Sequence, residues 1–249
     1  MAALIDDELI IPTRFRGPAH SGNGGWVSGA LAQATGHDGP VTVRLRTPPP
    51  LERPLRLTSD DDGRVSAHDD ALLVAQAWPD DRLQPPGADV LARASQVSDT
   101  IAHEAGLRYR GLADHPFPSC FTCGTGRDPA EALCLRTGRL PGEDGMFATA
   151  WTPAQVSVPI TWAALDCPGA WAGDVAGRPM VLGTMTAGWA HPVPRLPRVG
   201  VAHLILSWVS GESGRKVFSH TALFDDDRQL LAYAEATWIL IDPAAVLPH

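Results

Sequence analysis

Alternating hydrophobic and polar positions divide the first half of the chain into short strand-like segments. These segments are Leu9–Arg16, Val41–Arg46, Leu55–Leu57, Gly63–Ala67 and Leu72–Trp78. A run of small and apolar residues, Trp26–Thr35, follows the first of them, and its composition favours a buried helix. The pattern therefore predicts a strand, a glycine-rich turn, one helix and then several antiparallel strands.

The second half repeats this order of elements. Its strand-like segments are Leu133–Leu140, Met146–Trp151, Met180–Thr186, Val199–Val209, Lys216–Phe224 and Leu230–Leu240. A turn at Pro141–Gly145 separates the first two, and the apolar stretch Pro159–Asp166 predicts a helix after them. The shared order predicts an internal duplication, with a sheet wrapped around one apolar helix in each half.

The segments between the halves differ from both of them. They are a polar, proline-rich linker at Pro79–Pro86, a helical pattern at Asp89–Ala105 and a cysteine-bearing loop at His115–Pro129. We therefore predict an N-terminal unit over residues 1–88, a linker helix and loop over 89–129, and a C-terminal unit over 130–249.

Composition and charge narrow the class of protein. A chain of 249 residues can bury a sizeable core, and its net charge of −8 with scattered arginines argues against a nucleic-acid partner. No apolar run is long enough to span a bilayer, and the chain begins with acidic residues instead of a basic signal region. Four cysteines are too few for a disulfide scaffold. We expect a soluble, cytoplasmic protein with no membrane partner.

Two adjacent glycines, Gly24 and Gly25, stand where the first predicted helix begins. Their N–H groups lie at the positive end of the helix dipole, where they could hold an oxygen that becomes negative during a reaction. Alternatively, the glycines let the helix pack closely. His20 could act as a general base, bind substrate or bond to the backbone. Asn23 could position a substrate carbonyl or cap the helix.

Two acidic residues lie in apolar surroundings. Asp166 is the only acid between Val156 and Ala172, so burial would raise its pKa and suit it to activating water. Alternatively, Asp166 caps a helix that begins at the following Cys-Pro pair. Glu235 lies within an apolar strand, and its side chain either faces the helix or is solvated on the outer face.

The motif Cys120–Gly124 resembles half of a zinc knuckle. A closed zinc site needs four ligands, and the nearest candidates, Cys134 and His115, do not fit a standard zinc spacing. A redox Cys-x-x-Cys usually begins a helix, whereas the neighbouring proline and glycine indicate a loop here. We interpret the motif as a structural loop covering a pocket and expect no metal and no cofactor, with a zinc site as the open alternative.

The repeated order of strand, glycine turn, buried helix and long strands resembles the double hot-dog arrangement of type II acyl-CoA thioesterases and their relatives. The resemblance is carried by Phe15–Gly25, Trp162–Asp166 and Ala234–Trp238. It implies an α+β fold of two tandem hot-dog units, each an antiparallel sheet wrapped around one long apolar helix. It also implies a covalent pseudo-dimer, either monomeric or assembled further as a homo-oligomer.

The resemblance also implies a composite site between the two units. In that family, a glycine turn supplies backbone amides to the thioester carbonyl, and a helix carboxylate of the other unit, with Thr and Gln, orients the hydrolytic water. Gly24 and Gly25 correspond to the amide donors and Asp166 to the carboxylate. The threonine and glutamine positions fall at Thr184 or Thr186 and around Glu235, where this chain has no glutamine.

The implied activity is hydrolysis of an acyl-CoA or related acyl thioester. We expect His20, Asn23, Trp26 and Thr186 to contact the substrate. One alternative is a hydratase or dehydratase of acyl thioesters, in which His20 would pair with Asp166. Another is a non-catalytic acyl-CoA or lipid-binding protein, which the missing glutamine suggests. The absence of a G-x-S-x-G elbow argues against an α/β-hydrolase route.

Overall fold

The computed structural model describes residues 4–5, 8–142, 145–192, 194–242 and 244. Its N-terminal strands are β1 (Leu4–Ile5), β2 (Glu8–Ile10), β3 (Val41–Leu45), β4 (Pro54–Ser59), β5 (Val65–Asp69) and β6 (Leu72–Pro79). Its C-terminal strands are β7 (Gly138–Arg139), β8 (Phe147–Trp151), β9 (Met180–Trp189), β10 (His203–Ser213), β11 (Lys216–Phe224) and β12 (Leu230–Leu240). The helices are α1 (Gly24–Ala34), α2 (Ala88–Gln96), α3 (Asp99–Leu107) and α4 (Val158–Ala172), with short 3-10 turns at Thr13–Phe15 and Arg110–Leu112.

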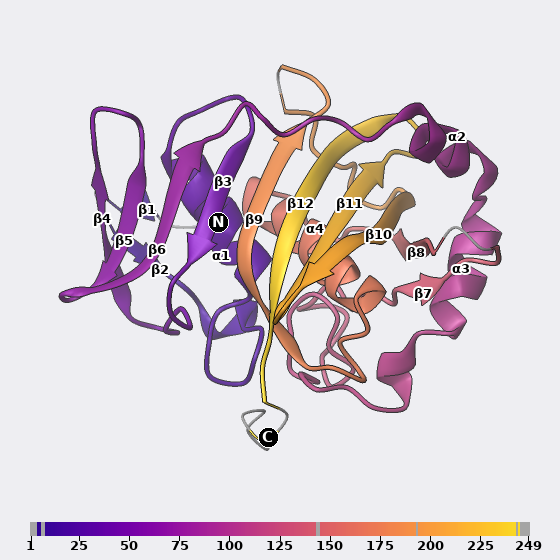
Figure 1. Cartoon of the computed structure of the whole chain (residues 1–249), viewed down its shortest axis with the longest axis horizontal. Helices are drawn as coiled ribbons and strands as arrows, with labels where there is room; N and C mark the ends of the chain where they lie inside the picture. The colour runs from indigo at the N-terminus through magenta and orange to yellow at the C-terminus, as the bar shows by residue number, and fades with distance from the viewer. Residues whose placement is uncertain (1–3, 6–7, 143–144, 193, 243, 245–249) are drawn as a thin grey trace.

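One antiparallel sheet joins the strands of both halves, in the order β1-β2-β4-β5-β6-β3-β9-β12-β11-β10-β8-β7 (Figure 1). The sheet order β2-β4-β5-β6-β3 of the first half reappears as β8-β10-β11-β12-β9 in the second half. Along the chain, α1 lies between β2 and β3, and α4 lies between β8 and β9. Strands β3 and β9 pair antiparallel and join the two halves of the chain. This topology confirms the predicted duplication and defines two hot-dog units that share a continuous sheet.

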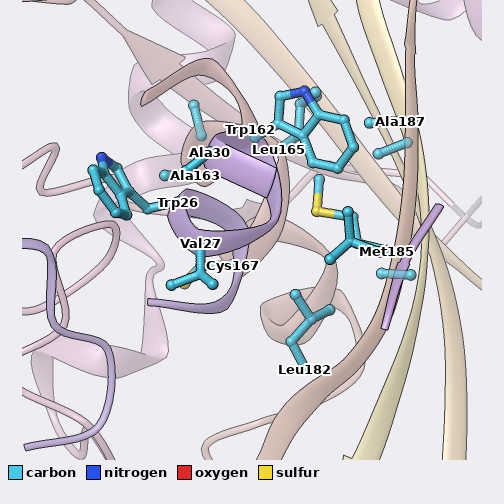
Figure 2. Close-up of a cluster of buried hydrophobic side chains, with 14 of the residues drawn as sticks. Trp26, Val27, Ala30, Trp162, Ala163, Leu165, Cys167, Leu182, Met185 and Ala187 are labelled. Atoms are coloured by element: carbon cyan, nitrogen blue, oxygen red, sulfur yellow. The ribbon is translucent and has the colours of Figure 1, made fainter. Parts of the chain in front are cut away.

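Helices α1 and α4 pack against each other and against the same side of the sheet (Figure 1). Glycines allow the close approach, since a Cβ built on Gly29 would lie 2.7 Å from Pro159 Cα of α4. Side chains from both helices and from β9 form one core, in which Trp162, Leu165 and Met185 are buried (Figure 2). The apolar composition of both predicted helices is therefore explained by burial on nearly every side.

The predicted helix over Asp89–Ala105 is two helices, because the chain turns at Val97 and Ser98 caps α3. Apolar side chains of α2 and α3 form a second cluster with β8, β10 and β11, which includes Ala94, Ala105 and Leu206. The linker helices thus cover the sheet face opposite α4 at this end. Among the described helices, none is long and apolar enough to cross a membrane.

Two predicted strands are shorter than the alternating pattern indicates. The segment beginning at Leu9 leaves the sheet after Ile10 and turns at Thr13–Phe15. In the segment Leu133–Leu140 only Gly138–Arg139 is a strand, because Leu133 N–H and Leu135 N–H donate to carbonyls of the cysteine-bearing loop. The predicted turn at Pro141–Gly145 includes residues 143 and 144, which lie outside the described residues.

Replacing Ser98 by alanine is expected to lower the free energy of unfolding by about 1 kcal/mol. The reason is that Ser98 Oγ accepts the Ile101 N–H at 3.2 Å and satisfies one of the free donors at the start of α3. Urea titration of Ser98→Ala beside Ser95→Ala measures the difference, since the exposed Ser95 hydroxyl only bonds to Ala92 O within α2. Equal losses in the two variants would contradict a capping contribution.

Candidate active site

A cavity of about 500 Å³ lies where α1, α4 and the cysteine-bearing loop meet the ends of β3, β9 and β12. Its volume is in the range of small-molecule binding sites. Both hot-dog units contribute to its walls, which are formed by residues 17–24, 45–49, 180–183, His115, Phe117, Cys120, Cys123, Asp166, Cys167, Ala170, Trp171, Val175, Trp238, Ile239 and Ile241. Most of these side chains are apolar, and Asp166 is the carboxylate among them.

Asp166 is a buried residue inside α4, with only 2% of its surface exposed. Its Oδ2 accepts hydrogen bonds from Gly25 N at 2.9 Å and from Asn23 Nδ2 at 3.1 Å. Its Oδ1 is also buried, and no hydrogen-bond partner for it occurs among the described residues. The alternative that Asp166 caps a helix is wrong, because α4 continues through Pro168 to Ala172.

Asn23 connects the start of α1 to this carboxylate. Asn23 Oδ1 accepts the Trp26 N–H at 2.9 Å, which confirms the capping alternative for this residue. The cap also fixes the orientation of the amide group, so that Nδ2 points toward Asp166. The N-terminus of α1 therefore holds the Asp166 side chain with one backbone donor and one side-chain donor.

The two glycines of the turn differ in their surroundings: Gly25 N–H contacts Asp166, and Gly24 lines the cavity. The N–H of Gly25 is occupied by Asp166 Oδ2, so the expectation that it donates to a substrate is corrected: it positions the carboxylate instead. Gly24 lines the cavity and is the first helical residue, where a backbone N–H has no acceptor within the helix. Gly24 therefore lies at the cavity wall, and its role as a donor to a bound carbonyl oxygen stays a prediction.

Burial raises the pKa of Asp166 to about 7 from its usual value near 3.8. The hydrogen bonds from Gly25 and Asn23 oppose this shift, because they stabilise the charged form. Burial of the carboxylate raises its pKa by more than these hydrogen bonds lower it, because the site is almost completely closed to water. The carboxyl group is therefore able to gain and lose a proton near neutral pH.

His20 lies at the cavity wall, whereas Trp26 lies in the hydrophobic core. His20 lines the cavity as an exposed residue of the glycine turn, and no hydrogen bond joins it to Asp166 in the described structure. Trp26 is 1% exposed and stacks on Phe15 with ring centroids 4.4 Å apart. The expectation that Trp26 contacts substrate is therefore corrected, because its ring belongs to the core and does not line the cavity.

Thr184, Thr186 and Glu235 are not brought to Asp166. They lie on the outer face of the sheet, where Thr186 Oγ1 is 2.7 Å from Thr42 Oγ1 and the Glu235 side chain is 53% exposed. The cause is a β-bulge in β9, which pairs Thr184 with Thr237 but Leu182 with Trp238. Without that bulge, Thr184 and Thr186 would share the inward face of Leu182.

Sequence reasoning missed Cys167, which neighbours Asp166 in α4 and lines the cavity beside Cys120 and Cys123. The predicted loop is confirmed, since Cys120–Gly124 forms turns over the cavity. Cys134, the nearest candidate in sequence, lies elsewhere, with its Sγ 3.9 Å from Arg127 O. Cys167 lies among apolar residues in the sequence, which is typical of a core cysteine. The sequence feature that indicates a further role is its position directly after Asp166 in the predicted helix.

Comparison with known proteins defines the fold. No protein-family model matches the chain, and no curated sequence matches it. A conserved protein with hot dog fold from Alicyclobacillus acidocaldarius has a TM-score of 0.60 at 12% identity, covering 95% of this chain and 93% of that one. The acyl-CoA thioesterase II TesB2 from Mycobacterium marinum has a TM-score of 0.55 at 9% identity, covering 98% and 96%.

A third solved structure matches over a similar length. The bifunctional dehydratase-cyclase domain in ambruticin biosynthesis has a TM-score of 0.56 at 16% identity, covering 98% of this chain and 94% of that domain. Together with the repeated strand order, these matches show that the chain has a hot-dog fold over nearly its full length. At such identities they define the architecture, and the chemistry has to be argued from the cavity.

Proposed function

We propose that the protein hydrolyses an acyl thioester, such as an acyl-CoA, in the cavity between its two hot-dog units. The observation that carries this proposal is the asymmetric environment of the Asp166 carboxylate. Oδ2 is anchored by Gly25 N–H and the Asn23 amide, while the buried Oδ1 is left without a partner among the described residues. A fixed carboxylate with one free oxygen beside a cavity can bind and activate a water molecule.

The reaction uses two groups on opposite sides of the α1–α4 contact. The thioester carbonyl oxygen accepts the Gly24 N–H, where the α1 dipole stabilises negative charge. Water held at Asp166 Oδ1 forms a bond to the carbonyl carbon as its proton passes to the carboxylate. The carbon–sulfur bond then breaks, the thiolate leaves, and the proton from Asp166 converts it to the free thiol.

The remaining cavity walls suit an acyl substrate. Apolar side chains from β9, β12 and α4, including Met180, Leu182 and Trp238, surround the space beside Asp166. Such walls bind an acyl chain and exclude bulk water, which strengthens the electrostatic interactions at the carbonyl. The similarity to an acyl-CoA thioesterase II supports the same substrate class.

A dehydratase is the second candidate, since a dehydratase-cyclase domain shares this fold. It would leave the thioester intact and would require a base aimed at the carbons next to the carbonyl. His20 faces the same cavity but is not hydrogen-bonded to Asp166 in the described structure. The anchored Asp166 and the adjacent Gly24 N–H therefore favour hydrolysis.

Incubation of the purified protein with a panel of acyl-CoAs of increasing chain length tests the proposed activity. We expect release of free CoA, measured with a thiol reagent against a protein-only blank, together with an equal amount of carboxylic acid. Tight acyl-CoA binding without release would contradict hydrolysis and support a binding protein. An altered acyl group on an intact thioester would instead support the dehydratase.

A further inference from the structure

Three buried cysteines from two distant segments converge on one wall of the cavity. Cys120 and Cys123 belong to the loop after α3, and Cys167 belongs to α4. All three Sγ atoms lie within 4.8 Å of one another, and those of Cys120 and Cys167 are 3.7 Å apart. The proposed hydrolysis uses none of these thiols.

The separation of the sulfur atoms fits a shared metal ion. Zinc binds thiolate sulfur at about 2.3 Å, so two sulfurs in its tetrahedron are about 3.8 Å apart. The 3.7 Å between Cys120 Sγ and Cys167 Sγ agrees with this edge. A disulfide would require the two sulfurs at about 2.05 Å.

The local backbone is built to present Cys120 and Cys123 together. Gly124 N–H donates to Cys120 O at 2.9 Å and closes a turn over residues 120–124. A Cβ on Gly124 would lie 2.4 Å from Pro118 O, so this tight turn requires glycine. Thr122 Oγ1 donates to Ala163 O at 3.1 Å and fastens the turn to the helix that carries Cys167.

A side-chain donor, Asn23 at the N-cap of α1, also reaches the cluster. Asn23 Nδ2 lies 3.7 Å from Cys120 Sγ and 4.0 Å from Cys167 Sγ. The Asn23 amide and the neighbouring Cys167 thiol are both placed to stabilise a thiolate at Cys120. Cysteines that served only as small apolar core residues would need no such set of donors.

We propose that Cys120, Cys123 and Cys167 bind one zinc ion as thiolates, with its fourth coordination position open to the cavity. Three protein ligands and one open position are the pattern of zinc sites that accept water or a substrate atom. His115 does not complete the set, because its Nδ1 accepts Phe117 N–H and its Nε2 bonds to Cys123 O. This site is argued from the sulfur geometry and does not depend on thioester hydrolysis.

The unmodified protein provides the first test. We expect elemental analysis of tag-free protein, reconstituted with Zn²⁺ under reducing conditions, to find about one zinc per chain. Replacing zinc with Co²⁺ is expected to produce thiolate-to-cobalt charge-transfer absorption and the visible bands of a tetrahedral ion. Absence of that charge-transfer absorption, or a zinc content near zero after reconstitution, would overturn the proposal.

Serine variants identify the ligands. Cys120→Ser, Cys123→Ser and Cys167→Ser are each expected to lose the bound zinc and the thiolate–cobalt absorption, whereas Cys134→Ser keeps both. Cys134 is the matched control because its Sγ lies away from the cluster, near Arg127 O. Circular dichroism identifies any variant that does not fold. Stoichiometric zinc in a folded Cys123→Ser variant, or loss of zinc in Cys134→Ser, would contradict the assigned ligands.

Discussion

Asp166→Asn is expected to lower kcat for thioester hydrolysis by about 10²–10⁴-fold, the usual contribution of a positioned general base. Asparagine has the same shape, and its carbonyl oxygen can still accept from Gly25 N–H and from Asn23. Its amide nitrogen cannot take a proton from water. Because binding contacts are kept, KM should change much less than kcat, and steady-state release of free CoA measures both.

Glu235→Gln is the matched control, since this carboxylate is exposed on the outer face of the sheet. It should leave kcat and KM unchanged. Zinc content is measured in both variants, because Asp166 Oδ2 is 4.0 Å from Cys167 Sγ, one of the proposed zinc ligands. This measurement distinguishes loss of the general base from loss of bound zinc. A folded Asp166→Asn variant with wild-type kcat would remove Asp166 from the mechanism.

Gly25→Ala is expected to lower the free energy of unfolding by about 1–3 kcal/mol and to abolish hydrolysis. A Cβ at this position would lie 2.4 Å from Asp166 Cβ, 2.8 Å from Trp162 O and 2.9 Å from Ala163 Cα. Two of these atoms are backbone atoms of α4, so the helices have to separate to admit the methyl group. Their separation would move Asp166 away from its two donors.

Gly211→Ala provides the control for that substitution, because a Cβ there meets nothing within 4 Å. Urea unfolding of both variants is expected to show a loss at Gly25 and little change at Gly211. Alanine also has a helix propensity up to about 1 kcal/mol better than glycine, which would stabilise Gly25→Ala if no clash occurred. Equal or increased stability of Gly25→Ala would therefore contradict the packing described for α1 and α4.

The order of elements and the duplication could be predicted from the sequence, because strand and helix periods are local properties. The segment Leu230–Leu240 was predicted with the bounds that β12 has, and both buried helices were found from their apolar runs. Asp166 was found because a single acid in an apolar helix is conspicuous. Substrate contact, close packing and helix capping were the roles predicted for Gly25 and Asn23, and donation from both residues to Asp166 was not among them.

What the sequence did not predict depends on long-range geometry. The outward positions of Thr184 and Thr186 follow from a one-residue bulge opposite Thr237, which reverses the face of every later side chain in β9. The partner of Cys120 and Cys123 is Cys167, brought in by docking of the loop on α4. Neither arrangement has a signature in residue spacing.

The most direct measurement of the central claim is mass spectrometry of the products formed from an acyl-CoA in heavy-oxygen water. The proposed mechanism predicts free CoA and an acid with one heavy oxygen from the wild-type protein, and neither above the uncatalysed rate from Asp166→Asn. Recovery of an intact or dehydrated thioester from the wild-type protein, or equal yields from the two proteins, would contradict hydrolysis by water activated at Asp166.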